Sequence, residues 1–233
     1  MKEITIATYN IRHGGDVDCD WNRLATVIRE SGADVVGLQE VDMLTRRVGG
    51  RDTMEGLRQA TGFDYALFIP TMDFDGGRYG TAILSRLPIL HEEIHALDAG
   101  EYEPRAFGCV TVSVGEGKDL WMINTHLSYK SEVQRNIQMG QLADWMKSRI
   151  PSDAAAVLTG DFNTADFASF SPFLEEGYAL INREDHRFDT FRNPPVAIDN
   201  IVYRQSALTP LAFDMIDSPC SDHNPLWCKF QLT

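Results

Sequence analysis

The sequence predicts a single α/β domain over residues 1–233, in which layers of β-sheet are covered by helices. Short, nearly continuous apolar runs, such as residues 4–11 and 35–38, are typical of strands buried on both faces. Segments with apolar residues at helical spacing lie between these runs. The strands occur both as hairpins and as strand–helix–strand units, and no repeat or linker-like stretch interrupts them.

In the first half of the chain, strands and helices alternate. The predicted strands lie at 4–11, 35–38, 64–69 and 81–85. A helix is predicted over residues 22–31. Asp52 and Glu55 have the spacing of a capping box, and they predict a second, short helix that Gly62 closes. We expect residues 73–80 to form a loop between two strands.

The second half predicts a hairpin, a long helix and three further strands. Residues 109–114 and 120–124 are expected to pair across a Gly-Glu-Gly turn. Residues 132–149 place their apolar side chains on one stripe and predict the longest helix. The remaining strands are predicted at 154–158, 197–203 and 226–232.

The net charge limits the partners that the protein can bind tightly. The chain has 34 acidic and 21 basic residues, which gives a formal charge of −13. Proteins that hold duplex DNA tightly normally carry a basic footprint, because contacts to phosphate supply most of the affinity. We therefore expect no tight duplex-DNA binding. A local metal ion can still supply positive charge at a phosphate, so the acidity does not exclude phosphoester chemistry.

Targeting signals and cysteine pairs are not evident in the sequence. No run of about 18 apolar residues is present, so no transmembrane segment is predicted. The first residues pass directly into a strand, which predicts a cytoplasmic protein; a secreted one is the alternative if a signal peptide has been removed. The four scattered cysteines are expected to be free thiols. We expect a monomer, although the sequence leaves the oligomeric state open.

Polar side chains follow apolar runs at four points of the chain. They are Asn10, Glu40, Asp161 and Asp222. Taken alone, Asn10 is more often a turn former and Glu40 a solvated strand end. Ends of adjacent strands, however, share an edge of the sheet where ligands gather. Carboxylate and amide oxygens at such an edge suit a hard cation such as Mg²⁺.

Asp161 and Asn163 are separated by one residue. If the chain is extended there, both side chains point to the same side. The carboxylate can then accept a proton from water, and the amide can orient a phosphoryl oxygen or the nucleophile. An Asx-type turn is the alternative interpretation.

Asp199 and His223 are expected to form a pair. Asp199 interrupts an otherwise apolar strand, and a buried carboxylate needs a partner to offset its desolvation. The imidazole of His223 is the expected partner, which would fix its tautomer and orientation. A surface break in the strand is the alternative.

Three more polar residues have both a functional and a structural interpretation. His126 ends a predicted strand, where a lone histidine is usually structural. Arg78 and Arg105 are expected to bind substrate. Arg105 can bind a phosphate oxygen through its planar fork or pair with an acid. Arg78 lies in a Gly-rich stretch that matches no phosphate-binding motif, so a plain loop is the alternative.

Seven motifs occur in an order that resembles the endonuclease/exonuclease/phosphatase superfamily, across nearly the whole chain. The motifs are Thr8-Tyr9-Asn10, Leu38-Gln39-Glu40, Tyr79-Gly80-Thr81-Ala82-Ile83-Leu84-Ser85, Asn124-Thr125-His126-Leu127, Gly160-Asp161-Phe162-Asn163, Ile198-Asp199-Asn200-Ile201 and Ser221-Asp222-His223-Asn224-Pro225. The resemblance implies a four-layer α/β sandwich, with two mixed β-sheets packed face to face, helices outside and the active site at one end of the sheets. It also implies a Mg²⁺-dependent phosphoesterase, since the superfamily includes nucleases, inositol-phosphate phosphatases, sphingomyelinases and deadenylases.

The resemblance also implies a metal site. Asn10 and Glu40 are similar to the principal metal ligands of the superfamily, and Asp222 would lie near the metal. We expect Mg²⁺ there, with Mn²⁺ as a possible substitute. The number of metal ions, one or two, stays open.

The catalytic roles that the resemblance implies fall on five residues. Asp161 and Asn163 would align or activate the attacking water and contact the phosphate. His223, oriented by Asp199, would be the other acid/base partner. His126 resembles the histidine that contacts the scissile phosphate in several branches of the superfamily.

We therefore expect a metal-dependent hydrolase that cleaves a small or lipid-derived phosphomonoester or phosphodiester by in-line attack of water. The first alternative is a nuclease that acts on DNA or RNA. The second, from a different class, is a catalytically inactive binding module on the same fold, and the presence of every motif residue argues against it. The sequence leaves the physiological substrate open, because specificity in such a fold lies on loops.

Overall fold

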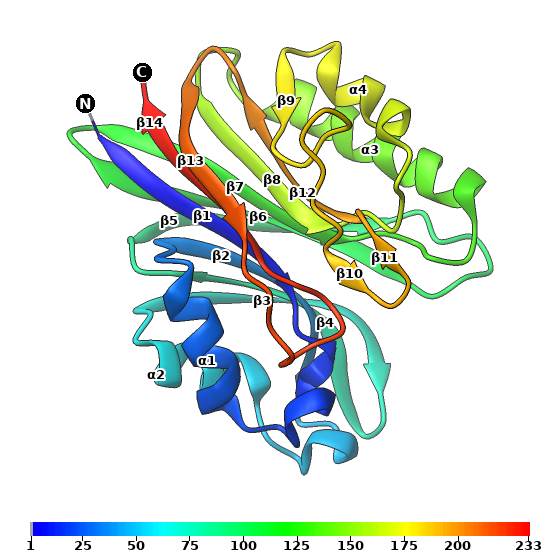
Figure 1. Ribbon diagram of the computed structural model, residues 1–233. Coiled ribbons are helices and arrows are strands. Elements are labelled where there is room, and N and C mark those ends of the chain that lie inside the picture. Colours follow the sequence, from blue (N-terminus) through cyan, green and yellow to red (C-terminus); the bar gives the residue numbers. More distant parts are fainter. Residues whose placement is uncertain (1) are drawn as a thin grey trace.

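The computed structural model describes residues 2–233 (Figure 1). Two six-stranded mixed sheets pack face to face, and helices cover both outer surfaces. The predicted four-layer α/β sandwich is therefore confirmed. The first sheet has the strand order β13–β14–β1–β2–β4–β3, and the second has the order β5–β6–β7–β8–β12–β9.

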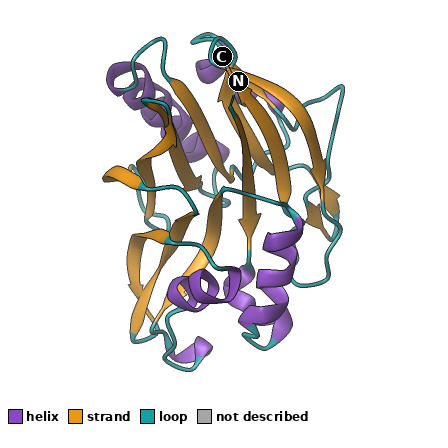
Figure 2. Cartoon of the chain, turned by 90° about the vertical axis from the view of Figure 1, so that its left-hand side faces the viewer, coloured by secondary structure: helices purple, strands orange, loops and turns teal. Residues whose placement is uncertain are grey.

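The first sheet is built from both ends of the described chain. Its strands are β1 (Glu3–Asn10), β2 (Val35–Met43), β3 (Tyr65–Phe74), β4 (Gly77–Ser85), β13 (Leu208–Met215) and β14 (Leu226–Leu232). Strand β1 pairs in parallel with β2 and antiparallel with β14. The first and last strands therefore lie side by side at the centre of this sheet, which also brings the two termini together (Figure 2).

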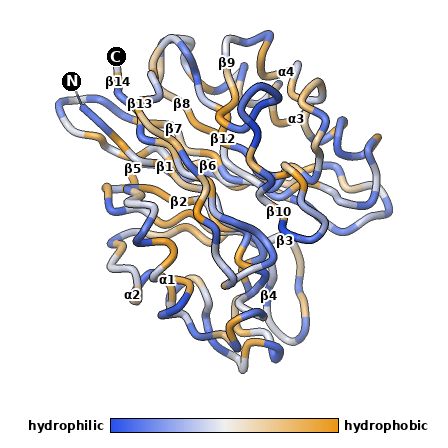
Figure 3. Tube along the Cα trace, in the orientation of Figure 1, coloured by the Kyte–Doolittle hydropathy of each residue, from blue (hydrophilic) through white to orange (hydrophobic). Residues whose placement is uncertain are grey.

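The second sheet comes from the middle of the chain. Its strands are β5 (Ile89–Leu97), β6 (Arg105–Gly115), β7 (Lys118–His126), β8 (Ala155–Asp161), β9 (Tyr178–Leu180) and β12 (Asp199–Arg204). A small hairpin of β10 (Phe191–Arg192) and β11 (Pro195–Val196) precedes β12. The loop before β10 is hydrophilic, whereas the strands of both sheets carry many apolar residues (Figure 3).

The helices form the two outer layers. They are α1 (Trp21–Glu30), α2 (Thr53–Thr61), α3 (Glu132–Arg149) and α4 (Ser171–Leu174). Short 3₁₀ segments lie at Arg46–Val48, at Phe167–Phe170 and at Arg12–Val17, the last of which is interrupted at His13 and Gly14. Asp52 caps α2 by accepting a hydrogen bond from the Glu55 N–H, as the sequence predicted, and Gly62 ends that helix with a φ of 74°. Among residues 2–233, no helix is both long enough and apolar enough to span a membrane.

Three apolar clusters hold the layers together. The central cluster joins the two sheets and contains Ile6 and Ile69 from the first sheet and Val110 and Val157 from the second. A second cluster lies between α3 and the second sheet, and a third lies between helices α1 and α2 and the first sheet. All four cysteines are buried free thiols, as expected.

The structure corrects the sequence prediction at several strands. Residues 73–80 are not a loop, because β3 and β4 continue to a tight turn at Asp75 and Gly76. Strands β5, β9 and β13 were not predicted. The edge strand β5 and the outer strand β13 expose many of their side chains, so they lack the apolar runs that indicate buried strands.

Candidate active site

Polar side chains from both sheets meet at one end of the sandwich. In the first sheet, Asn10 is the last residue of β1 and lies opposite Gln39 of β2. In the second sheet, Asp161 ends β8 and lies opposite His126 of β7 on one side and Asp199 of β12 on the other. Strand register alone therefore places three of the predicted residues in one row.

Glu40 enters this region through an irregularity in β2. The pairing of β2 with β4 shifts register between Leu38 and Val41, and Glu40 has a φ of 56°. Strand β2 continues to Met43, so the expectation that Glu40 ends its strand is wrong. Bulges of this kind re-aim a side chain and are common beside active sites. Here the bulge turns Glu40 toward the amide of Asn10, whose Nδ2 donates to Glu40 Oε1 at 3.2 Å.

One oxygen of Asp161 has three nitrogen neighbours. Asn10 Nδ2 donates to Asp161 Oδ2 at 3.0 Å. The Nε2 atoms of His126 and His223 lie 3.5 Å and 3.7 Å from the same oxygen. Four residues predicted from separate motifs are thus brought together around a single carboxylate.

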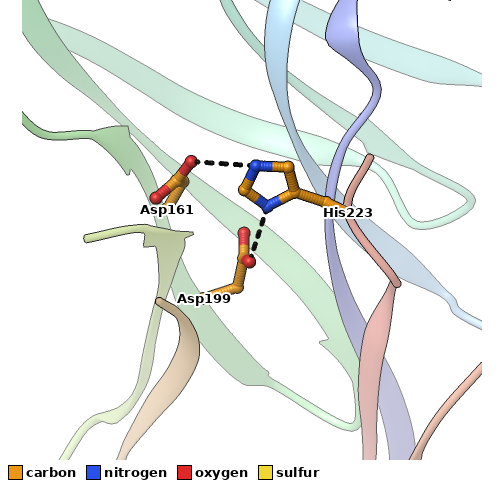
Figure 4. Close-up of side chains that lie close together, drawn as sticks. All are labelled: Asp161, Asp199 and His223. Carbon is orange, nitrogen blue, oxygen red and sulfur yellow. Dashed lines mark hydrogen bonds and ion pairs between the residues drawn. The ribbon is translucent and has the colours of Figure 1, made fainter. Parts of the chain in front are cut away.

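Asp199 orients His223, as the sequence predicted. The distance between His223 Nδ1 and Asp199 Oδ2 is 2.8 Å, and both side chains are almost fully buried (Figure 4). Because a carboxylate only accepts hydrogen bonds, Nδ1 carries the proton and Nε2 faces Asp161. Asp199 is the first residue of β12 and does not interrupt the strand, which corrects its predicted position.

The backbone at Asn163 is not extended, although an extended conformation was one of the two interpretations of the sequence. Its φ is 52°, and its N–H donates to Asp161 Oδ1 at 2.9 Å, which is the Asx-type turn. Asn163 Nδ2 donates to the carbonyl of Leu127 at 3.0 Å. Both Asp161 and Asn163 nevertheless line the same cavity.

The pKa values of Asp161 and His223 are both raised above their usual values. Burial and the adjacent Asp199 carboxylate raise the pKa of Asp161 to about 7. Burial lowers the pKa of His223, but Asp199 and Asp161 outweigh it and raise that pKa to about 10. Near neutral pH, His223 is therefore a cation beside a carboxyl group that can exchange a proton.

The other titratable groups of the site have distinct protonation states. Burial and the nearby Arg105 hold the pKa of His126 well below its usual value, so this imidazole is neutral. Burial raises the pKa of Glu40, but His13, His126 and Asn10 bring it down to about 2. Burial raises the pKa of Asp222. Glu40 is therefore more firmly ionised than Asp222.

The donor atoms of the site fit a divalent cation. Glu40 and Asp222 offer carboxylate oxygens, which hard cations prefer. The amide of Asn10 lies beside Glu40, but its Oδ1 accepts a hydrogen bond from the Arg12 N–H at 3.0 Å and its Nδ2 faces the carboxylates. A compact cluster of Asp161, Asp199 and His223 also offers three ligand atoms within 4.8 Å of one another. In that cluster the Nδ1 atom of His223 already donates to Asp199, so this nitrogen is not free to bind a cation.

A cavity of about 580 Å³ opens onto these residues. Arg105 lines it and is almost fully buried; its Nη1 lies 2.9 Å from Glu103 Oε1. Arg78 does not line this cavity. It lies on the outer part of β4 beside a separate hollow, 3.9 Å from Asp73.

Sequence reasoning missed the aromatic wall of the cavity. Phe74, Tyr79, Tyr129 and Phe191 line it together with Arg47. Arg47 donates two hydrogen bonds to the buried Asp42 and lies over the Phe74 ring at 4.6 Å. Tyr79 was part of a recognised motif, but the loop expected at residues 73–80 concealed the β3–β4 hairpin, which carries Phe74 and Tyr79.

A buried polar network around Asn124 lies next to the site, between the two sheets, and joins them. Asn124, two residues before His126, donates from Nδ2 to the carbonyls of Leu38 and Ala82, each at 2.9 Å. Its Oδ1 accepts from Gln39 Nε2 at 2.7 Å and from Thr159 Oγ1 at 3.1 Å. This network fixes β2 against β7 and β8, which carry Glu40, His126 and Asp161.

The chain belongs to the Endonuclease/Exonuclease/phosphatase family, whose model matches residues 7–223. Members of this family are generally hydrolases that act on phosphoester bonds, and they commonly use divalent metals. Among curated proteins, the chain is 27% identical over 229 residues to YbhP of Escherichia coli K12, a protein described as uncharacterized. This match covers 90% of the present chain and 87% of YbhP.

Several solved structures share the fold of this chain, and their names refer to different proteins. An endonuclease/exonuclease/phosphatase from Beutenbergia cavernae is 21% identical with a TM-score of 0.85, covering 100% of this chain and 72% of the other. The human nocturnin catalytic domain is 20% identical with a TM-score of 0.77, covering 100% and 94%. A mannosyl-6-phosphatase from Bacteroides thetaiotaomicron is 20% identical with a TM-score of 0.73, covering 99% of each chain. At these identities the similarity establishes the fold only.

Proposed function

We propose that this protein is a divalent-metal-dependent phosphoesterase that hydrolyses a small or lipid-derived phosphoester by in-line attack of water. The observation that carries the proposal is the position of Asp161, which lies within 3.7 Å of the nitrogens of Asn10, His126 and His223. Such an array can bind a phosphoryl group and exchange protons with it.

Each side chain has a chemical role in this proposal. Asn10, Glu40 and Asp222 would hold Mg²⁺ or Mn²⁺, which when bound neutralises charge that develops on the phosphate and the leaving oxygen. Asp161 accepts a proton from the attacking water, and its pKa of about 7 suits that task near neutral pH.

The remaining residues bind and orient the phosphoryl group. His223, fixed by Asp199, offers a protonated Nε2 to the phosphate or the leaving oxygen. The neutral His126 and the second N–H of Asn163 can donate to phosphoryl oxygens. Arg105 adds a buried positive charge at the cavity wall.

The cavity supports a small or lipid-derived substrate. Its volume of about 580 Å³ lies within the usual range of about 300–1,000 Å³ for small-molecule sites. Aromatic side chains line it beside the polar cluster, so an apolar leaving group can pack there while the phosphate contacts Asp161 and the histidines.

Turnover of p-nitrophenyl phosphate and bis-p-nitrophenyl phosphate with Mg²⁺ or Mn²⁺ tests the proposal, and also separates monoester from diester chemistry. We expect activity that a chelator abolishes. Glu40→Gln should remove most activity and weaken Mg²⁺ binding in calorimetry, because the amide lacks the charge that a hard cation prefers. Glu116→Gln, in the exposed turn between β6 and β7, is the matched control and should behave like the parent.

Other outcomes would favour the alternatives. Binding of phosphoesters without turnover of any ester in a broad panel would indicate an inactive binding module. Faster hydrolysis of oligonucleotides than of inositol phosphates or sphingomyelin would indicate a nuclease. Unchanged Mg²⁺ affinity in Glu40→Gln would exclude Glu40 as a ligand.

A further inference from the structure

The loop after β1 holds a histidine in an unusual conformation beside Glu40. Arg12 and His13 have φ values of 43° and 47°, in the left-handed region that residues other than glycine rarely adopt. The loop is fixed by hydrogen bonds: the Arg12 N–H donates to Asn10 Oδ1 at 3.0 Å, and the Gly14 N–H donates to the Ile11 carbonyl at 2.8 Å. Strained conformations of this kind persist where the surroundings enforce them, and they cluster at functional sites.

The imidazole of His13 points one nitrogen at the carboxylate of Glu40. Its Nδ1 lies 3.8 Å from Glu40 Oε2, which is too long for a hydrogen bond. Within residues 2–233, this Nδ1 is buried and has no hydrogen-bond partner. Buried polar atoms are normally paired, so a nitrogen aimed at a carboxylate from this distance suits a cation placed between the two.

We propose that His13 supplies a nitrogen ligand, through Nδ1, to the divalent cation that Glu40 binds. This inference rests on the proposed function and adds a residue to its metal site. Ligand bonds of about 2.1 Å place two donor atoms of one ion about 3–4 Å apart, so the observed spacing needs little adjustment. Imidazole nitrogen is a softer ligand than oxygen. The site should therefore favour a first-row transition-metal ion over Mg²⁺.

The neighbouring charges are compatible with this geometry. Asp222 is the other carboxylate on this side of the site, and its Oδ2 lies 3.4 Å from Arg12 Nε. Arg12 also pairs with Asp16 at 2.9 Å, so its guanidinium is held at the rim of the loop. His13 is thus the side chain of this loop that faces Glu40.

Pulsed electron paramagnetic resonance of the Mn²⁺-loaded protein tests the ligand directly. We expect a nitrogen coupling to Mn²⁺ in the parent that disappears in His13→Gln. Calorimetry with Co²⁺ and Mg²⁺ provides a second readout. Co²⁺ affinity should fall at least tenfold in His13→Gln, whereas Mg²⁺ affinity should change less than threefold. His126→Gln and His223→Gln control for the two other histidines of the site, and both should retain the coupling.

A second variant displaces the ring without removing it. A Cβ at Gly15 would lie 2.9 Å from His13 Nε2, so Gly15→Ala should push the imidazole from its place. We expect a weakened nitrogen coupling and reduced Co²⁺ affinity. Gly140→Ala is the matched control, because a Cβ there meets no atom within 4 Å. Circular dichroism and the thermal midpoint verify that each variant is folded.

The outcomes distinguish this inference from the proposed function. If Mn²⁺ binds and depends on Glu40 but shows no nitrogen coupling, or a coupling that His13→Gln leaves intact, the His13 assignment is wrong and the phosphoesterase proposal stands. If the parent binds no divalent ion, both are wrong.

Discussion

At the residue scale, the pair of Asp199 and His223 makes stability depend on pH. Asp199 contributes most among the charges that, against the effect of burial, raise the pKa of His223 from 6.5 to about 10. A raised histidine pKa contributes stability that is complete below pH 6.5 and is lost as the pH rises through 10. Asp199→Asn should therefore lose less stability than the parent over this range. Urea unfolding of the metal-free protein at pH 6.5 and 10 measures the difference, and equal losses in both proteins would contradict it.

The two histidines that flank Asp161 should act together. His126→Ala and His223→Ala are each expected to lower kcat by roughly 10²–10⁴, the usual range for a positioned acid or base. The double variant should lose less than the product of the two, because both residues act on one phosphoryl group. Measuring kcat and the thermal midpoint together separates the roles. A near-parental kcat with a lowered midpoint in His126→Ala would make that residue structural.

The sequence predicted which residues gather at the site better than it predicted their conformations. Asn10, His126 and Asp161 end strands, and apolar runs before polar residues indicate such ends. The φ of 52° at Asn163 belongs to the Asx-type turn, which the sequence offered only as the alternative. The φ of 56° at Glu40 was not predictable, because it depends on strand pairing. The bulge at Glu40 forms only when β2 pairs with β4.

At the scale of elements, the sequence identified buried strands and amphipathic helices and missed strands with polar faces. Helix α3 and strand β14 have the predicted bounds, because their apolar spacing is regular. Strand β5 carries the polar run His91-Glu92-Glu93 and is a strand only because β6 pairs with it along its length. Residues 73–80 are polar or glycine apart from Phe74 and Tyr79, so they carry no apolar run, and the extension of the β3–β4 hairpin to its tight turn was also missed.

The packing of β2 against the second sheet leaves no room for a side chain at Gly37. A Cβ there would lie 2.2 Å from Thr159 Oγ1 and 2.5 Å from Asn124 Oδ1. Gly37→Ala should therefore lower the free energy of unfolding by about 1–3 kcal/mol, the usual cost of overpacking. It should also lower kcat, because Asn124 lies two residues before His126.

The same substitution in a helix serves as the control. Gly140 lies inside α3 and has open space around it, so Gly140→Ala should raise the free energy of unfolding by about 0.5–1 kcal/mol. Chemical unfolding of both variants measures whether the free energy of unfolding falls in Gly37→Ala and rises in Gly140→Ala. A Gly37→Ala protein with parental stability and kcat would show that the polar network adapts to a methyl group.

At the scale of the whole molecule, the charge of −13 should oppose binding to a polyanion. We expect a dissociation constant for duplex DNA weaker than micromolar at about 0.15 M salt, where screening is already substantial. Binding is measured on the Glu40→Gln, Asp161→Asn double variant, so that cleavage does not interfere. Sub-micromolar binding would instead favour the nuclease interpretation.

The central position of β14 beside β1 has a consequence for how the protein is made. His223 lies three residues before the start of β14, and β14 is a neighbour of the strand that ends in Asn10. During translation, β1 leaves the ribosome long before β14, and the edge that β14 covers stays unpaired until β14 has been synthesised. An unpaired edge of this kind invites aggregation. A product that stops before residue 226 lacks β14, one of the two strands that flank β1, so a prematurely terminated chain would expose the edge of β1 and could not complete the first sheet.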